Sequence, residues 1–195
     1  ERLAAHGVGP GRTVVLLLER SIEMVVAQVA CAGLGGTFVP LDVSQPQART
    51  DQLLSLVGPV ATVRHGDDGV VVEGLAATGA MQDLVDGVLC VLLTSGSTGV
   101  PKGVALTQPA LAAQIDAVAP FLAAGPGRRS SYSCNVAFDF SIWELWLGLT
   151  TGMTLVVIDR DTLLSTRRLT ALLEGHRVDI LSMTTSLLST HLQID

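Results

Sequence analysis

The segment of this chain richest in chemically useful groups is a short run of hydroxyls and glycines near its middle. Residues 94–103 read Thr-Ser-Gly-Ser-Thr-Gly-Val-Pro-Lys-Gly and follow an apolar stretch directly. Glycines let successive backbone N–H groups turn toward an anion, hydroxyls add donors, and a lysine adds positive charge. The run therefore predicts a phosphate-binding loop at the carboxyl end of a buried strand, where open α/β sheets bind ligands. The residues assigned to this loop are Thr94, Ser95, Gly96, Ser97, Thr98, Gly99 and Lys102.

Lys102 is the only lysine of the chain, against 11 arginines. A lysine, with a compact charge on a flexible side chain, thus occupies a position where this arginine-rich chain would be expected to use a planar guanidinium. A plain Ser/Gly turn between two strands is the structural alternative for the glycines and hydroxyls. A Walker A loop fails on position, because it requires Gly-Lys followed by Ser or Thr, whereas residues 101–103 read Pro-Lys-Gly. We therefore expect phosphate binding without P-loop NTPase chemistry.

A second group of candidate residues lies at 138–144, with the sequence Phe-Asp-Phe-Ser-Ile-Trp-Glu. Ser141 and Glu144 have the spacing of a capping box, which predicts that they begin a helix running through Leu149. Asp139 precedes this box and lies between two aromatic residues, where desolvation would make an unpaired carboxylate costly. We therefore expect a cationic partner for Asp139, with an exposed loop aspartate as the alternative.

The elements that must position these residues alternate between short apolar runs and helical patterns. Ser21 is expected to cap the first long helix, and the glycines at 35–36 to end it. Residues 60–87 indicate only short strands and loops. Runs that are apolar on both faces fit parallel strands covered by helices, so the fold class is α/β, with largely parallel sheets covered by helices. Strands are expected at 13–18, 37–39, 88–93, 103–106, 132–134, 153–158 and 178–183, and helices at 22–34, 46–56, 109–122, 141–149, 163–173 and 187–192.

Composition narrows the function classes. With 12 Lys and Arg against 18 Asp and Glu among 195 residues, the formal charge is −6, which argues against nucleic-acid and anionic-membrane binding. Residues of the apolar types make up 48% of the chain and charged residues 15%, which excludes disorder and predicts one domain with a packed core. The longest uncharged run, 24–41, holds three glycines and a proline and does not suggest a membrane span. Three widely spaced cysteines indicate reduced thiols and a cytoplasmic location.

The loop at 94–103 resembles the signature of the adenylate-forming (AMP-binding) superfamily, and specifically of the adenylation domains of nonribosomal peptide synthetases. In that family such a loop wraps the triphosphate of ATP. Segments at 7–12, 32–42, 138–144 and 176–181 agree with the family in order and spacing, so the resemblance spans the chain. It implies that residues 1–195 are part of the large N-terminal domain of such an enzyme, an N-terminal fragment that is inactive alone. The C-terminal half and the small C-terminal domain, with the glutamate that binds Mg²⁺, would be absent.

The resemblance also implies roles for the second group of residues. In the family, the aspartate at the position of Asp139 binds the α-amino group of the substrate, and Phe140, Trp143 and Ser182 occupy positions that line the side-chain pocket. Asp-Phe-Trp at these positions is similar to threonine-activating domains. The implied reaction is ATP-dependent activation of an amino acid to aminoacyl-AMP, with ATP and Mg²⁺ as cofactors. The acyl group would then pass to the phosphopantetheine of a peptidyl carrier protein, with neighbouring synthetase domains as further partners.

Three departures from the family pattern stand out. Leu93 replaces a tyrosine before the loop and Gln108 a histidine after it, and neither position carries bond-making chemistry. Residues 183–186, Met-Thr-Thr-Ser, replace a proline-containing turn, which leaves the placement of Ser182 open. Two alternative functions therefore remain: a non-catalytic truncated module that binds a nucleotide or a partner protein, and a related acyl-CoA or aryl-acid ligase, against which Asp139 argues.

Overall fold

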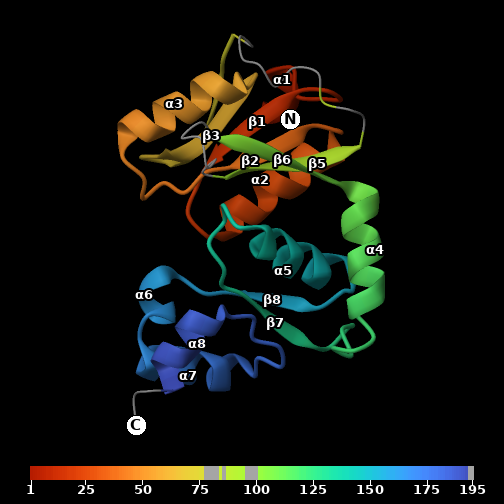
Figure 1. The fold of residues 1–195 in the computed structure, drawn as a ribbon, viewed down its shortest axis with the longest axis vertical. Helices are drawn as coiled ribbons and strands as arrows, with labels where there is room; N and C mark the ends of the chain where they lie inside the picture. The colour runs from red at the N-terminus through yellow and green to blue at the C-terminus, as the bar shows by residue number, and fades with distance from the viewer. Residues whose placement is uncertain (77–83, 85–86, 95–100, 193–195) are drawn as a thin grey trace. The chain divides into compact units, whose positions relative to one another are not determined.

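The computed structural model of the chain describes residues 1–76, 84, 87–94 and 101–192. The chain divides into two compact units, Glu1–Leu111 and Ala112–Asp195, and each is described by itself (Figure 1). The elements of unit 1 are α1 (Arg2–Ala5), β1 (Thr13–Leu17), α2 (Ile22–Gly33), β2 (Thr37–Pro40), α3 (Gln47–Val57), β3 (Ala61–Gly66), β4 (Gly69–Gly74), β5 (Val88–Thr94) and β6 (Lys102–Thr107). Helix α4 (Gln108–Val118) begins in unit 1 and ends in unit 2. The elements of unit 2 are β7 (Arg129–Tyr132), α5 (Asp139–Thr150), β8 (Thr154–Val157), α6 (Arg160–Leu163), α7 (Thr166–His176) and α8 (Thr185–Leu192).

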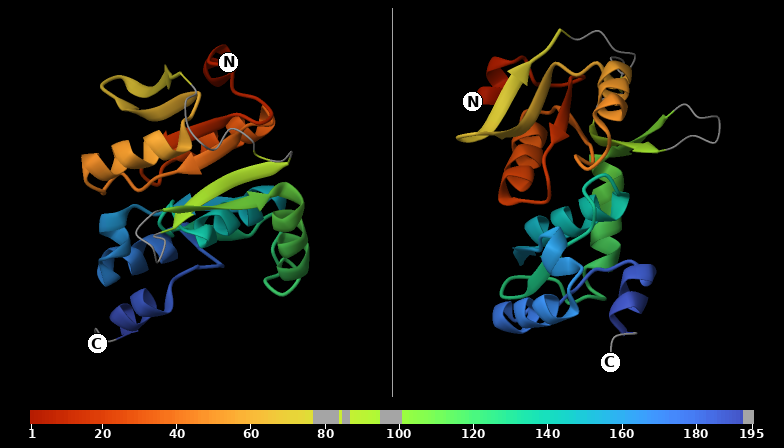
Figure 2. Two further views of the ribbon diagram at one scale, coloured as in Figure 1. Left: turned by 45° about the horizontal axis from the view of Figure 1, so that its top comes forward. Right: turned by 90° about the vertical axis from the view of Figure 1, so that its left-hand side faces the viewer.

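Unit 1 is built on a six-stranded sheet in the order β4-β3-β1-β2-β5-β6. The four inner strands pair in parallel, and the two outer strands, β4 and β6, pair antiparallel as the second arms of hairpins. Helices α2 and α3 lie on opposite faces of this sheet, as Figures 1 and 2 show. Parallel strands covered on both faces read as continuous apolar runs, and this is why strands β1 and β5 carry so few polar residues. The expected α/β class is confirmed.

Local sequence signals set the ends of the covering helices. The Ser21 hydroxyl accepts a hydrogen bond from the backbone N–H of Met24 at 3.1 Å and so caps α2. Gly35, with φ of +73°, takes the left-handed conformation that follows the end of that helix. Gly58 ends α3 in the same conformation. The predicted bounds of both helices are therefore confirmed to within one residue at each end.

The core of unit 1 fixes strand β5, which leads into the predicted phosphate loop. Val88 and Val91 of β5 are buried together with Val15, Val39 and Leu53 from β1, β2 and α3. The buried hydroxyl of Thr37 on β2 also donates to the carbonyl of Val88 at 2.9 Å. Strand β5 is thus held by apolar packing and by its neighbour before it reaches its carboxyl end.

Unit 2 contains a parallel pair of strands, β7 and β8, with α5 packed against both (Figure 1). Tyr132, Ile142, Leu145 and Leu147 are almost fully buried, which places the core between the strands and this helix. Gly148 allows the close approach, because a Cβ at this position would lie 2.5 Å from Cδ2 of Leu155 on β8. A second cluster, around Ile158, Leu163 and Leu169, joins β8 to helices α6 and α7.

Unit 2 also corrects several expectations. The strand expected at 132–134 lies at Arg129–Tyr132, because the following residues turn away to bind a side chain of α5. The strand expected at 178–183 is reduced to a single bridge between Ser130 and Ile180. The helix expected at 163–173 is two helices, α6 and α7, because Asp159 and Ser165 each cap one. Among the described residues, no helix has the length and apolar character needed to cross a bilayer.

The contact between α5 and β8 can be tested by replacing Gly148. We expect Gly148→Ala to lower the free energy of unfolding by about 1–3 kcal/mol, because the added methyl group overpacks against Leu155. Gly175→Ala on α7 is the matched control. A Cβ there meets no atom within 4 Å, so alanine should stabilise the helix by about 0.5–1 kcal/mol. Urea unfolding of both variants measures the difference, and equal stability of the two would contradict the packing.

Candidate functional site

Two residues of the predicted phosphate loop, Thr94 and Lys102, form the last strand pair before the connection of the β5–β6 hairpin. They are register partners, and the Thr94 hydroxyl donates to the Lys102 carbonyl at 3.3 Å. The Lys102 side chain is exposed. The other predicted loop residues, Ser95, Gly96, Ser97, Thr98 and Gly99, lie outside the described residues. The structure thus places the segment as the connection between a buried inner strand and an outer strand.

Asp139 is the first residue of α5 in unit 2, and its side chain is exposed. Its Oδ1 accepts a hydrogen bond from the backbone N–H of Phe140 at 2.8 Å. No cation among the described residues forms an ion pair with it. Phe138 and Phe140 are themselves exposed, so they do not remove the Asp139 carboxylate from water, and the cationic partner expected for Asp139 stays a prediction. A carboxylate at this position also stabilises the amino end of the helix dipole.

The two predicted aromatic residues of the pocket, Phe140 and Trp143, do contact each other. Their ring centroids are 5.1 Å apart and their planes are inclined by 19°, an offset stack on one side of α5. Trp143 is buried, whereas Phe140 remains 41% exposed. The indole N–H of Trp143 is buried and has no hydrogen-bond partner within the described part of the chain. The pair therefore combines an apolar surface with one donor that is not used.

The capping box predicted from Ser141 and Glu144 is absent. The helix begins two residues earlier, with Phe138 as its N-cap, and the Ser141 hydroxyl lies near the carbonyls of Val136 and Phe138 at 3.1 and 2.7 Å. Glu144 does not turn back to the helix start, since its carboxyl is buried against the end of β7. The physical reason is that the chain after β7 offers Glu144 two backbone N–H groups as well as hydroxyls.

The carboxyl of Glu144 is only 2% exposed and is surrounded by donors. Its Oε2 accepts from the backbone N–H groups of Ser133 and Cys134 at 3.0 and 2.9 Å. Its Oε1 lies 3.2 Å from the Ser131 hydroxyl and 3.0 Å from the Ser133 hydroxyl. Burial raises the pKa of the Glu144 carboxyl, and these hydrogen bonds oppose the rise.

Ser182, the third predicted pocket residue, is joined to the same cluster. Its backbone N–H donates to the Ser131 hydroxyl at 3.0 Å, and its carbonyl accepts from the Ser133 hydroxyl at 2.7 Å. Both bonds are made by the backbone of Ser182 and not by its hydroxyl. Ser131 and Ser133 therefore connect the backbone of Ser182 to the carboxyl of Glu144.

Sequence reasoning missed the two serines that make this connection. Their signal is weak but real: Ser131 and Ser133 flank Tyr132 at the end of a strand, so both hydroxyls lie on the same face. A buried glutamate on the next helix is the partner that such a face requires. Without knowing that Glu144 is buried, the pair looks like ordinary strand serines.

The remaining titratable groups play no part in the candidate site. Burial raises the pKa of the Cys31 and Cys90 thiols to about 12, and none of the three cysteines, all of which lie among the described residues, forms a disulfide. His191 lies 2.8 Å from the Thr166 hydroxyl and 2.9 Å from the Leu163 carbonyl, which anchors α8 and supports a structural role. Within the described residues, no group of three His, Cys, Asp or Glu side chains could hold a metal ion.

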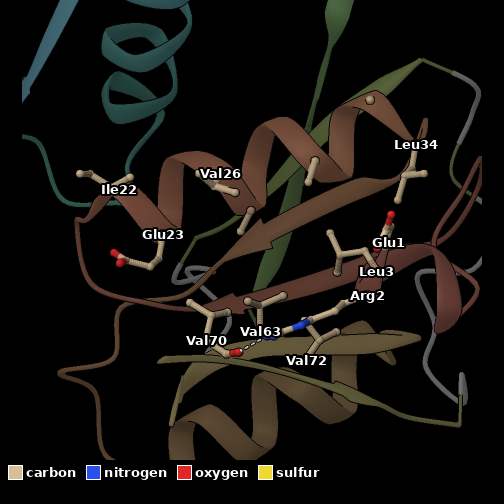
Figure 3. Close-up of a pocket in the computed structure, with 13 residues that line it drawn as sticks. Glu1, Arg2, Leu3, Ile22, Glu23, Val26, Leu34, Val63, Val70 and Val72 are labelled. Atoms are coloured by element: carbon tan, nitrogen blue, oxygen red, sulfur yellow. Dashed lines mark hydrogen bonds between the residues drawn. The ribbon is translucent and has the colours of Figure 1, made fainter. Parts of the chain in front are cut away.

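A cavity of about 600 Å³ lies in unit 1 beside α1, α2 and the β3–β4 hairpin, as Figure 3 shows. Its walls are mainly apolar and include Ile22, Val26, Val63 and Val72. Arg2 spans one side and donates to the carbonyl of Val70 at 2.7 Å. None of the predicted site residues lines this cavity, so it is not part of the candidate site.

The chain is similar to several known proteins in sequence and in fold. Tyrocidine synthase 2 of Brevibacillus parabrevis is 30% identical over 197 residues, which cover 93% of this chain. The o-succinylbenzoate CoA synthetase of Bacillus subtilis, in complex with its acyl-adenylate intermediate, has the same fold, with a TM-score of 0.81, 23% identity and all of this chain covered. A four-domain nonribosomal peptide synthetase bound to AMP and glycine also superposes, with a TM-score of 0.81, 23% identity and 99% of this chain covered.

The chain spans only part of each of these proteins: 6% of tyrocidine synthase 2, 55% of the CoA synthetase and 15% of the four-domain synthetase chain. The family model described as AMP-binding enzyme matches residues 1–195, the whole length of the sequence. The resemblance identified at residues 94–103 is thereby confirmed for the complete chain. This chain belongs to the AMP-binding enzyme family, with relatives among the adenylation domains of nonribosomal peptide synthetases.

Proposed function

We propose that the enzyme to which this chain belongs activates an α-amino acid with ATP and supplies it to nonribosomal peptide synthesis. The family is common to ligases of several acid substrates, so the choice of an amino acid must rest on the site. The observation that carries it is Asp139, an exposed carboxylate with no cationic partner among the described residues, beside the Phe140–Trp143 stack. Such a group is suited to bind a substrate ammonium.

The proposed reaction is a displacement at phosphorus. A carboxylate oxygen of the amino acid attacks the α-phosphorus of ATP, the bond from that phosphorus to the bridging oxygen of the β-phosphate breaks, and pyrophosphate leaves with the bonding pair. Catalysis of this kind depends on positioning and on neutralising charge, and it needs no side-chain nucleophile. We accordingly assign no bond-making role to a residue of this chain.

Within this proposal, Thr94 and Lys102 begin and end the segment that holds the β- and γ-phosphates. Their pairing next to the hairpin connection supports this role, because it keeps a hydroxyl and an ammonium at the two ends of one short segment. Residues 95–99 would supply the remaining donors. Mg²⁺ would accompany ATP and neutralise phosphate charge, but the described residues offer no cluster to hold it, so we derive no step from the metal.

We further propose threonine as the substrate and a peptidyl carrier protein as the acceptor. Phe140 and Trp143 would enclose a small side chain, and the Ser182 hydroxyl or the unused indole N–H of Trp143 could bind one polar group on it. The aminoacyl group would then leave AMP for the thiol of a phosphopantetheine arm. The relation to tyrocidine synthase 2 supports carrier loading and partnership with neighbouring synthetase domains.

The role of Lys102 is tested in the complete enzyme by exchange of labelled pyrophosphate into ATP. Lys102→Ala should raise the KM for ATP by about tenfold or more, because a charge-assisted contact to phosphate is worth about 1.5–3 kcal/mol. Lys102→Arg should raise the KM for ATP by less than Lys102→Ala, because arginine keeps the positive charge. Val104→Ala, at an exposed position on the same strand, is the matched control. A Lys102→Ala enzyme with the KM of the Val104→Ala enzyme would refute the assignment.

The role of Asp139 is tested with a panel of acids in the same exchange assay. Asp139→Asn should lower kcat/KM for L-threonine by about tenfold or more, since a hydrogen bond to a charged group is worth about 1.5–3 kcal/mol. Asp161→Asn, another exposed first-turn carboxylate, controls for the effect on a helix dipole and should leave turnover unchanged.

The panel also separates the alternatives. Exchange driven by an aryl acid, unaffected by Asp139→Asn, would favour the acyl-CoA or aryl-acid ligase, for which the fold of the o-succinylbenzoate CoA synthetase is the supporting observation. Exchange with a large aromatic amino acid but not with threonine would reject the threonine assignment alone. No exchange with any acid would favour a non-catalytic binding module.

A further inference from the structure

We propose that Glu144, held as a neutral carboxylic acid, closes a ring of hydrogen bonds through Ser131 and Ser133 that fixes the backbone of Ser182, and that it thereby positions one wall of the acid-substrate pocket. The ring is argued from the geometry of unit 2. Its consequence for the substrate rests on the proposed function, in which Ser182 lines that pocket.

The first step concerns which group donates in the contact between the Ser133 hydroxyl and Glu144. The Ser133 hydroxyl lies 2.7 Å from the carbonyl oxygen of Ser182 and 3.0 Å from Oε1 of Glu144. A hydroxyl has a single hydrogen, and a backbone carbonyl can only accept. The shorter contact, at the usual O–H···O distance, therefore takes the hydrogen of Ser133. The contact between Ser133 and Glu144 then needs a hydrogen from the carboxyl, which only the protonated form of Glu144 supplies.

The other half of the ring fits the same assignment. The backbone N–H of Ser182 donates to the Ser131 hydroxyl at 3.0 Å, which leaves the hydrogen of Ser131 for Oε1 of Glu144 at 3.2 Å. Each hydroxyl hydrogen is then used once, while the backbone N–H of Ser133 is shared between Oε2 and Oε1 of Glu144 at 3.0 and 3.2 Å. Both backbone polar groups of Ser182 are bound. Such closed chains of hydrogen bonds strengthen one another in a low-dielectric interior.

The surroundings of Glu144 favour the neutral form. Burial raises the pKa of this carboxyl, and the groups that oppose the rise are hydrogen-bond donors of Ser131, Ser133 and Cys134. The other carboxylate of α5, Asp139, is exposed.

The charged groups on the elements packed against α5 are engaged elsewhere. Strand β8 carries no ionisable side chain. At the start of β7, the carboxylate of Asp179 lies 3.5 Å from Nε of Arg128 and accepts from the backbone N–H of Arg129 at 2.8 Å. The guanidinium of Arg129 donates to the carbonyl of His176 at 2.9 Å. The remaining titratable neighbours among the described residues are the buried phenol of Tyr132 on β7 and the partly buried thiol of Cys134, whose backbone N–H binds Glu144.

The ring explains how Ser182 can be placed without a rigid turn after it. Residues 183–186 contain no proline, and Ser182 itself lies in no helix or strand. Its position is instead set by two serine hydroxyls that are oriented by Glu144. If Glu144 ionises, its negative charge competes for the hydrogen of Ser133, and the Ser182 carbonyl loses its donor. Glu144 is therefore a positioning residue that acts through Ser131 and Ser133, and it does not touch the reacting atoms.

The first test uses the complete enzyme and the KM values for L-threonine and for ATP in pyrophosphate exchange. Ser133→Ala and Glu144→Leu should raise the KM for the amino acid by about tenfold, with the KM for ATP within about twofold of wild type. Glu144→Gln should stay near wild type, because its amide nitrogen can donate to the Ser133 hydroxyl, as the protonated carboxyl does, and its amide oxygen can accept from the backbone N–H groups. The contact with Ser131 would only reverse its direction, with the amide nitrogen as the donor. Ser130→Ala is the matched control, since the buried Ser130 hydroxyl on the same strand has no hydrogen-bond partner among the described residues.

Two results of this test would overturn the inference. One is an unchanged KM for the amino acid in a folded Ser133→Ala enzyme. The other is a Ser130→Ala enzyme as impaired as Ser133→Ala, which would mean that any change on β7 has the same effect. Should Glu144→Leu fail to fold, Ser133→Ala still decides, because it removes only one hydroxyl.

The second test does not depend on activity. The infrared difference spectrum of wild type minus Glu144→Gln at neutral pH should contain the carbonyl band of a protonated carboxylic acid. The free energy of unfolding of the wild type should also depend on pH, because the pKa of Glu144 is raised in the folded state. As the pH rises from about 4.3, the pKa of an unfolded glutamate, to the folded pKa, the wild type should lose stability relative to Glu144→Gln. A carboxylate band in place of the acid band would overturn the ring. An enzyme that exchanges with no acid, yet shows the acid band, would refute the proposed function and leave the ring standing.

Discussion

The burial of the Glu144 carboxyl is the constraint on which the arrangement of unit 2 depends. An ionisable group almost removed from water must be surrounded by donors or be neutralised, and the chain that follows β7 supplies donors to Glu144. To bring the N–H groups of Ser133 and Cys134 to it, that chain must leave the strand at Tyr132. The same demand fixes the face of α5 that packs on β7, and with it the stack of Phe140 and Trp143.

Unit 1 is governed by a different force, which is apolar burial on both faces of its sheet. Strand β5 is an inner strand whose side chains are almost entirely buried, so its carboxyl end is a fixed point. The hairpin to β6 then brings Lys102 opposite Thr94 by strand pairing alone. Hydrophobic packing therefore supplies rigidity at the point where the segment proposed to bind phosphate begins.

The features that define the family and the residues proposed to select the substrate therefore lie in different parts of the molecule. Membership of the AMP-binding family extends over the whole chain and follows from the sheets, their order and the loop signature. In the proposed function, the identity of the acid depends on a few side chains in unit 2, which the shared fold leaves free to vary. The Ser131 hydroxyl accepts from the backbone N–H of Ser182, and the Ser133 hydroxyl donates to its carbonyl. These two bonds show how such a position can be held without the restraint that a proline ring would impose.

The sequence by itself determined the α/β class, the bounds of α2 and α3 and the phosphate-loop signature, because each depends on local patterns: apolar runs, a serine cap and glycines that permit positive φ. Only the tertiary structure decided how Ser141 and Glu144 are used. Their spacing fits a capping box, but a buried carboxyl binds the donors that surround it in space, and those come from β7 and the turn after it. The exposure of Asp139 was decided in the same way, since aromatic neighbours in the sequence bury a carboxylate only when they are themselves buried.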